Sequence, residues 1–288
     1  MSTQAVVAAR RPDRATILER LHACIERGEA ILGAGAGTGI SAKFEERGGA
    51  DLILVYNSGR YRMAGHGSLA GLLPIGDANA VVAEMGEREI LPAVVDTPVI
   101  AGVNGTDPTR SMPALVRRLC DLGFSGVINF PSHGVIDGQW RKSLEDTGFG
   151  YDREVAMIAA AAELGVFTMA YVFDEGDARE MIAAGVDVVV AHMGLTAGGS
   201  IGASKDLAGG LDDAVRKVTA IAEASTAEAE EVIVLCHGGP IATPYDTEYV
   251  LTRTPAVGFV GASSMERLPV ETALEDTTRV FKQVKVAK

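Results

Sequence analysis

Short runs of apolar residues recur along the chain, each followed by a turn that carries glycine or asparagine and then by an amphipathic stretch. The runs are almost continuously hydrophobic, which is typical of strands buried on both faces of a parallel sheet. The pattern predicts eight strands, at residues 30–35, 52–57, 98–104, 126–130, 166–173, 186–192, 231–237 and 257–262.

Helical patterns fill the segments between these strands. In residues 109–123 the apolar side chains recur at helical spacing and form one stripe. Similar helices are expected at 153–165, 177–187, 211–225 and 268–285, and a further helix at 12–30, with Asp13 or Thr16 as its cap, precedes the first strand. The alternation predicts an α/β protein, a closed (β/α)8 TIM barrel with an additional N-terminal helix, as one domain over residues 12–288. Residues 1–11 are expected to be a flexible N-terminus, and an open doubly wound sheet is the alternative fold.

Composition narrows the possible partners and compartment. The chain has 288 residues, which suits one barrel of about 250 residues, and its net charge of −12 argues against nucleic acid and anionic membranes as partners. Cys24, Cys120 and Cys236 are widely spaced, which favours a reducing cytoplasmic location. No apolar run approaches the ~18 residues of a membrane span, and the first residues do not resemble a secretory signal.

Two histidines end neighbouring strands, at the face where a TIM barrel has its active site. His192 closes the sixth expected strand and His237 closes the seventh. Histidine transfers protons near neutral pH, so we expect both to be catalytic, the alternative being hydrogen bonds to neighbouring loops. Cys236 precedes His237 and by strand alternation points toward a helix.

Three asparagines and one arginine follow the second to fourth strands. Asn57, Asn104 and Asn129 are disfavoured inside strands, and we expect their amides to orient a substrate, local turn chemistry being the alternative. Arg60, close behind Asn57 and Ser58, is the candidate clamp for a carboxylate or phosphate. Arg62 and His66 are interpreted as ordinary loop residues.

Glycine-rich loops offer backbone N–H groups to an anion. Gly35 and Gly37 lie in GAGAGTG at 33–39, which lacks the spacing GxGxxG of dinucleotide-binding loops and predicts either a tight turn or an anion nest. The expected anion-binding residues of the last three loops are Gly198, Gly199, Ser200, Gly238, Gly239 and Ser263. Residues 195–208 are expected to close as a lid, unless they are only a disordered connection.

Five longer motifs carry a resemblance to a known family. They are YNSGRYRMAGHGSLAGLLPIGDAN, GVINFPS, AHMGLTAGGSIGA, CHGGPIATP and GFVGASSMERLPVE, and together they resemble the phosphoenolpyruvate hydrolase-like family over about residues 15–285. The resemblance implies a TIM barrel related to the phosphoenolpyruvate mutase/isocitrate lyase superfamily, whose members act on pyruvate-like substrates with Mg²⁺. It also implies a homo-oligomer.

The sequence departs from that superfamily at the residues expected to bind the metal. The superfamily carries acidic residues after its third and fourth strands, where this chain has Asn104 and Asn129. Asp107 lies further into its loop, and Asp174 and Glu175 follow the fifth strand. The sequence therefore assigns no cofactor, and only the resemblance implies Mg²⁺. We expect the metal requirement to be weak or absent. The expected function is an enzyme acting on a small phosphorylated or phosphono C3-type acid, a hydrolase or lyase; the alternative is a non-catalytic barrel that senses a small anionic metabolite or docks a protein.

Overall fold

The computed structural model describes residues 12–287, so the expected flexible N-terminus at 1–11 lies outside the described residues. Eight parallel strands close into one barrel in chain order, with β1 pairing both β2 and β8, which confirms the (β/α)8 prediction and excludes the open sheet. The strands are β1 (Ile31–Gly35), β2 (Leu52–Val55), β3 (Val99–Val103), β4 (Gly126–Asn129), β5 (Phe167–Val172), β6 (Val188–His192), β7 (Ile233–His237) and β8 (Gly258–Gly261).

Alternate strand residues fill the barrel, and the residues between them face the helices. Leu52 and Leu54 on β2 belong to the interior cluster, as do Val188 and Val190 on β6 and Tyr56 directly after β2. The strand residues of opposite parity, among them Ile53 and Val189, belong to a second cluster that includes helix residues. This alternation decides which side chains reach the mouth of the barrel.

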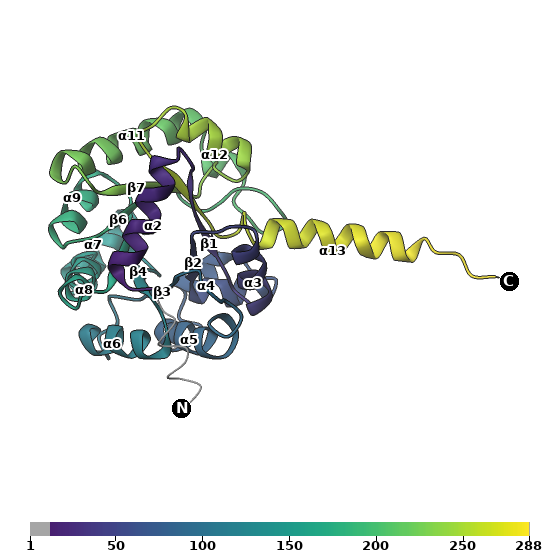
Figure 1. Cartoon of the computed structure of the whole chain (residues 1–288), viewed down its shortest axis with the longest axis horizontal. Coiled ribbons are helices and arrows are strands. Elements are labelled where there is room, and N and C mark those ends of the chain that lie inside the picture. The colour runs from purple at the N-terminus through teal and green to yellow at the C-terminus, as the bar shows by residue number, and fades with distance from the viewer. Residues whose placement is uncertain (1–11, 288) are drawn as a thin grey trace.

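The additional N-terminal helix, α2 (Arg14–Glu26), closes one end of the barrel. Its buried residues Ile17, Leu21 and Cys24 join the interior cluster, and Figure 1 shows α2 lying across the barrel end. Asp13, one of the two expected caps, accepts a hydrogen bond from the Thr16 N–H at 2.8 Å.

Further helices surround the barrel between the strands (Figure 1). Four match expected helices: α6 (Met112–Leu122), α8 (Asp152–Glu163), α9 (Glu175–Ala183) and α11 (Leu211–Glu228). The sequence pattern did not predict α3 (Gly39–Arg47), α4 (Asn57–Met63), α5 (Ala78–Met85), α7 (Gly138–Asp146), α10 (Lys205–Ala208) or α12 (Pro244–Leu251). Short helical turns also occur at η1 (Ser68–Leu72), η2 (Gly86–Ile90) and η3 (His133–Val135).

The last helix, α13 (Arg267–Lys282), forms where a helix was expected but leaves the barrel instead of packing on it (Figure 1). Its first residue, Arg267, is buried, whereas Leu274 and Phe281 are 63% and 74% exposed. Within residues 12–287 no helix combines the length and the hydrophobicity needed to cross a membrane.

Candidate active site

A cavity of about 440 Å³ opens at the carboxyl ends of the strands. Its lining includes Tyr56 after β2, Tyr171 on β5, and His192 and His237 at the ends of β6 and β7. These side chains continue the inward-facing rows of their strands, since 188, 190 and 192 share one parity, as do 233, 235 and 237. The strand pattern therefore places both histidines at the mouth.

The two imidazoles lie side by side. His192 and His237 are direct partners in the β6–β7 register, and their ring centroids are 4.7 Å apart. The Nδ1 of His192 accepts a hydrogen bond from the Gly194 N–H at 3.0 Å, and the Nδ1 of His237 lies 2.6 Å from the Val260 carbonyl oxygen. Burial lowers the pKa of His237 to about 4 and that of His192 well below its usual value, so both rings are neutral at pH 7.

Two phenols lie beneath the histidines. The hydroxyl groups of Tyr56 and Tyr171 are 2.7 Å apart, and the Tyr171 ring contacts both imidazoles at centroid distances of 4.8 and 5.0 Å. Burial raises the pKa of both hydroxyls, which therefore stay protonated at neutral pH. Phe130 and Phe173 complete an aromatic wall on this side of the cavity.

The arginine at this cavity is Arg62, not the expected Arg60. Arg62 is buried and forms an ion pair with Glu266, with Nη2 to Oε2 at 2.8 Å. Arg60 lies on another side of α4, where its guanidinium pairs with Glu84 at 3.1 Å and Glu89 at 3.4 Å. Successive helix positions are about 100° apart, so residues 60 and 62 face nearly opposite directions once α4 is known to be a helix.

Glu266 also occupies the expected anion nest after β1. The Gly37 N–H donates to its Oε1 at 2.6 Å, and Arg62 donates additionally to the Gly35 carbonyl at 3.3 Å. The nest thus binds a carboxylate of the protein itself. Glu45 lies nearby, and burial together with the Glu266 charge raises the pKa of Glu45 to about 8.

The three expected asparagines do not converge on this cavity. Asn57 is buried and donates to the Gly71 carbonyl at 2.9 Å, and its neighbour Ser58 lines the cavity. Asn129 follows the outward-facing parity of β4, where it bonds Glu154 at 2.7 Å and the backbone of Tyr171. Asn104 lies at a second cavity, described below.

The glycines after β6 and β7 bring two loops into contact. Gly238 and Gly239 have φ of +74° and +58°, and a Cβ on either residue would overlap the backbone of Met193 or Gly194. The Gly239 N–H donates to the Gly194 carbonyl at 2.9 Å. In this structure that N–H serves loop packing, while Ser263 in the next loop does line the cavity.

The loop with Gly198, Gly199 and Ser200 packs against the start of α13. Ser200 donates to Glu271 through its backbone N–H at 3.0 Å and its hydroxyl at 2.7 Å, and Arg267 donates to the Gly198 carbonyl at 3.0 Å. The expected N–H donors of this loop are thus directed in part at a glutamate of the protein.

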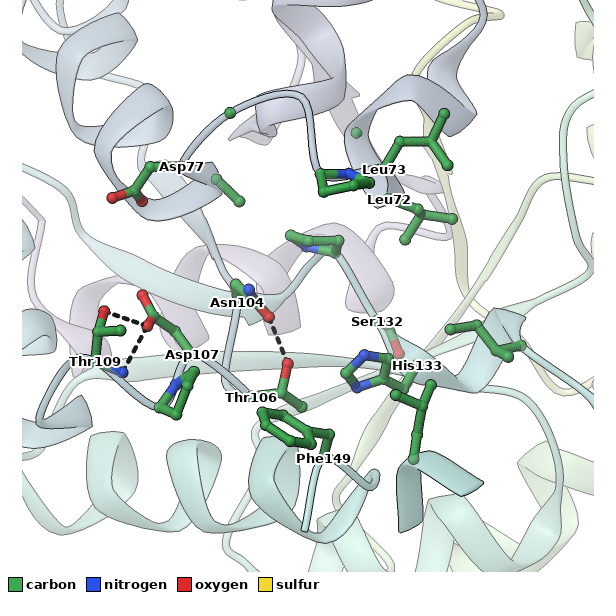
Figure 2. A pocket seen from close by; sticks show the side chains of 18 of the residues that line it. Leu72, Leu73, Asp77, Asn104, Thr106, Asp107, Thr109, Ser132, His133 and Phe149 are labelled. Atoms are coloured by element: carbon green, nitrogen blue, oxygen red, sulfur yellow. Dashed lines mark hydrogen bonds between the residues drawn. The ribbon is translucent and has the colours of Figure 1, made fainter. Parts of the chain in front are cut away.

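A second cavity of about 440 Å³ adjoins the first, with Leu72 lining both. Figure 2 shows Asn104, Thr106, Asp107 and His133 around it, with Asn104 accepting a bond from Thr106 at 2.8 Å. Burial alone would raise the pKa of Asp107, but hydrogen bonds from Thr109, Arg110 and Asn79 lower it to about 2. Asp107 therefore stays ionised to low pH and organises its own loop.

The donor groups expected for Mg²⁺ do not fit a metal here. Within residues 12–287 no group of three or more His, Cys, Asp and Glu side chains is arranged to hold an ion. Asp107 is engaged by its neighbours, Asp174 caps α9 by accepting from the Asp177 N–H, and the Asn129 amide is used between β4 and β5.

The chain belongs to the phosphoenolpyruvate hydrolase-like family, whose model matches residues 16–284. Among individual relatives, the ToMV resistance protein Tm-1(GCR237) of Solanum lycopersicum is 54% identical over 272 residues, which are 94% of this chain and 36% of that protein. The chain thus spans about a third of the length of this relative.

Similar folds occur in solved structures of low sequence identity. The phosphoenolpyruvate phosphomutase of Streptomyces platensis subsp. rosaceus aligns with a TM-score of 0.59 and 16% identity over 92% of this chain and 87% of that one. Phosphonopyruvate hydrolase in complex with oxalate and Mg²⁺ aligns with a TM-score of 0.56 and 18% identity over the same shares. The barrel therefore shares its fold with these two enzymes.

Proposed function

We propose that the protein is an enzyme that binds a small phosphorylated or phosphono C3-type acid in the cavity at the mouth of the barrel and acts on it as a hydrolase or lyase. The observation that carries this proposal is the pair of neutral, buried histidines whose rings lie 4.7 Å apart at a cavity of about 440 Å³. Neutral imidazoles next to one substrate are suited to proton transfer and to hydrogen bonding of a developing charge.

The remaining cavity groups fit a small polar ligand. Ser58, Ser68 and Ser263 supply hydroxyl groups, and Lys217 contributes a positive charge at the cavity wall. Arg62 adds hydrogen-bond donors, although Glu266 neutralises its charge. Phosphoenolpyruvate and phosphonopyruvate belong to the size class that such a cavity encloses.

The alternative is a non-catalytic barrel that senses a small anion or docks a protein. It is favoured by the ion pair that neutralises Arg62 and by the nest at Gly37, which already binds Glu266. A site built only for turnover of a strong anion would leave more of these donors available.

The deciding experiment follows phosphoenolpyruvate and phosphonopyruvate by ³¹P NMR, with and without Mg²⁺, and measures their binding by calorimetry. We expect turnover in the wild type and a loss of at least about 100-fold in H192Q and H237Q. H66Q is the matched control, because His66 lies on the exposed loop before η1. Binding without turnover would favour the sensor, and neither binding nor turnover would contradict both proposals for these acids.

We further propose that the protein forms a cytoplasmic homo-oligomer through α13. Val270, Leu274 and Phe281 recur at helical spacing and are exposed, and an isolated helix of this length is marginal in water without packing. Because α13 leaves the barrel between α12 and α3, where Ile40 and Phe44 of α3 are exposed, the fitting partner is a second copy of the chain.

A further inference from the structure

We propose that the two cavity histidines have fixed and opposite roles, with the Nε2 of His237 accepting a proton and the Nε2–H of His192 donating a hydrogen bond. This inference deepens the proposed enzyme function and rests on it for the roles, whereas the hydrogen positions rest on the structure alone. The backbone contacts of the two Nδ1 atoms carry the argument.

The Nδ1 of His237 must bear the hydrogen. Its neighbour at 2.6 Å is the Val260 carbonyl oxygen, which has lone pairs and no hydrogen to offer. Val260 is also the register partner of His237 across β7 and β8, so the strand pairing itself sets this contact. With the hydrogen on Nδ1, the Nε2 of neutral His237 carries a lone pair.

The Nδ1 of His192 must carry the lone pair. It accepts the Gly194 N–H at 3.0 Å, and a backbone amide can only donate. Gly194 is itself held in place, because its carbonyl accepts the Gly239 N–H at 2.9 Å and its φ is +98°. The hydrogen of neutral His192 therefore lies on Nε2.

The opposite tautomer of either ring is strongly disfavoured in free energy. With its hydrogen on Nε2, His237 would place the Nδ1 lone pair against the lone pairs of the Val260 carbonyl. With its hydrogen on Nδ1, His192 would place that N–H against the Gly194 N–H. Both sites are buried, so neither repulsion is relieved by water. The β6–β7 register then places one acceptor and one donor side by side, with ring centroids 4.7 Å apart. The pair is thus directional before any ligand binds.

This direction defines one balanced proton step. A proton moves from a water or substrate O–H to the Nε2 of His237, and the electron pair of that bond stays on the oxygen. The resulting imidazolium keeps its Nδ1–H on the Val260 carbonyl, which stabilises the positive charge. The Nε2–H of His192 stays on its nitrogen and donates a hydrogen bond to the oxygen that gains charge.

The first experiment reads the hydrogen positions in the ligand-free protein. Long-range ¹H–¹⁵N spectra of ¹⁵N-histidine protein at pH 7.5 distinguish the two tautomers, and H192Q and H237Q assign the signals among the five histidines. We expect the Nδ1–H form for His237 and the Nε2–H form for His192. The same tautomer in both rings, or free exchange between tautomers in either, overturns the inference.

The second experiment separates the roles with the phosphoenolpyruvate assay. Added imidazole should raise the activity of H237A at least about tenfold, in proportion to the concentration of neutral imidazole. It should not raise the activity of H192A. Restoration of H192A alone would reverse the roles. If the wild type shows no turnover, the proposed function fails for this substrate, while the spectra still decide the hydrogen positions.

Discussion

At the scale of single residues, strand alternation separates the groups of the cavity from those of the scaffold. His192 and His237 follow the inward parity, whereas Asn129 follows the outward parity and bonds Glu154 and both backbone groups of Tyr171. Asn129 thus ties β5 to β4 and α8. The amide that the sequence offered as a substrate ligand is engaged entirely by the protein in this structure.

Asn129→Ala should lower the free energy of unfolding by about 2–4 kcal/mol, because it leaves buried partners unsatisfied. Urea denaturation measures the effect. Asn104→Ala is the matched control, since it removes one half-buried bond to Thr106 and should cost about 1 kcal/mol or less. An Asn129 variant as stable as the control would contradict the structural role.

Glu154 makes stability depend on pH. Burial raises its pKa to about 7, so between pH 4.5 and 7 the folded state keeps a proton that the unfolded state has released. Its contribution to stability is present at low pH and is lost as the pH rises toward 7. From pH 4.5 to 8, the stability of Glu154→Gln relative to the wild type should improve by about 3 kcal/mol.

Unfolding curves at several pH values measure this trend. Glu163→Gln, on the exposed side of the same helix, is the control and should show no comparable change. A constant difference between Glu154→Gln and the wild type across this range would show that the Glu154 carboxyl does not hold the proton.

At the scale of elements, the loop after β6 and the start of α13 hold each other. Ser200 donates twice to Glu271, and Arg267 bonds both Glu271 and the Gly198 carbonyl. Gly199 has φ of +72°, and a Cβ there would overlap Arg267, Leu268 and Glu271. Gly199→Val should therefore release the loop from α13. If the loop closes as a lid, it must first break these contacts with α13.

Glu271→Ala should accelerate amide hydrogen exchange at Ser200 by about tenfold or more, because a bond to a charged acceptor is lost. Mass spectrometry of the peptide that covers residues 197–203 measures the exchange. Glu275→Ala is the control, because Glu275 pairs with Arg279 one turn further along the helix. Equal exchange in both variants would mean that Glu271 does not hold the loop.

At the scale of the whole molecule, the barrel and α13 have different surroundings. The barrel buries its apolar side chains in two clusters, whereas α13 carries Leu274 and Phe281 into solvent. Such a surface is typical of an interface, and a second copy would cover it reciprocally.

The double variant Leu274→Asp/Phe281→Asp should therefore convert an oligomer into a monomer, as measured by light scattering at micromolar concentration. Arg279→Ala, on the charged side of α13, should keep the oligomer. A wild-type protein that is already monomeric under these conditions would contradict the proposal, as would an unchanged mass of the double variant.

The sequence by itself determined the barrel. Its eight apolar runs contain eight parallel strands, because continuous hydrophobicity over about five to eight residues is stable only where both faces of a sheet are buried. The sequence also predicted that strands end at His192 and His237, and strand alternation places both side chains on one face, since residues of equal parity share a face. The helix α12 also carried a readable signal, the capping box of Thr243 and Asp246.

Only the tertiary structure decided which polar groups meet. The helix α4 buries Asn57, Ser58 and Arg62, so it lacks the apolar stripe that predicts a helix, and without the helix Arg60 and Arg62 are indistinguishable. Glu266 lies 204 residues from Arg62 in sequence, and no local pattern encodes that pairing. Strand register likewise set the contact of His237 with Val260, because such contacts depend on how distant segments align in space.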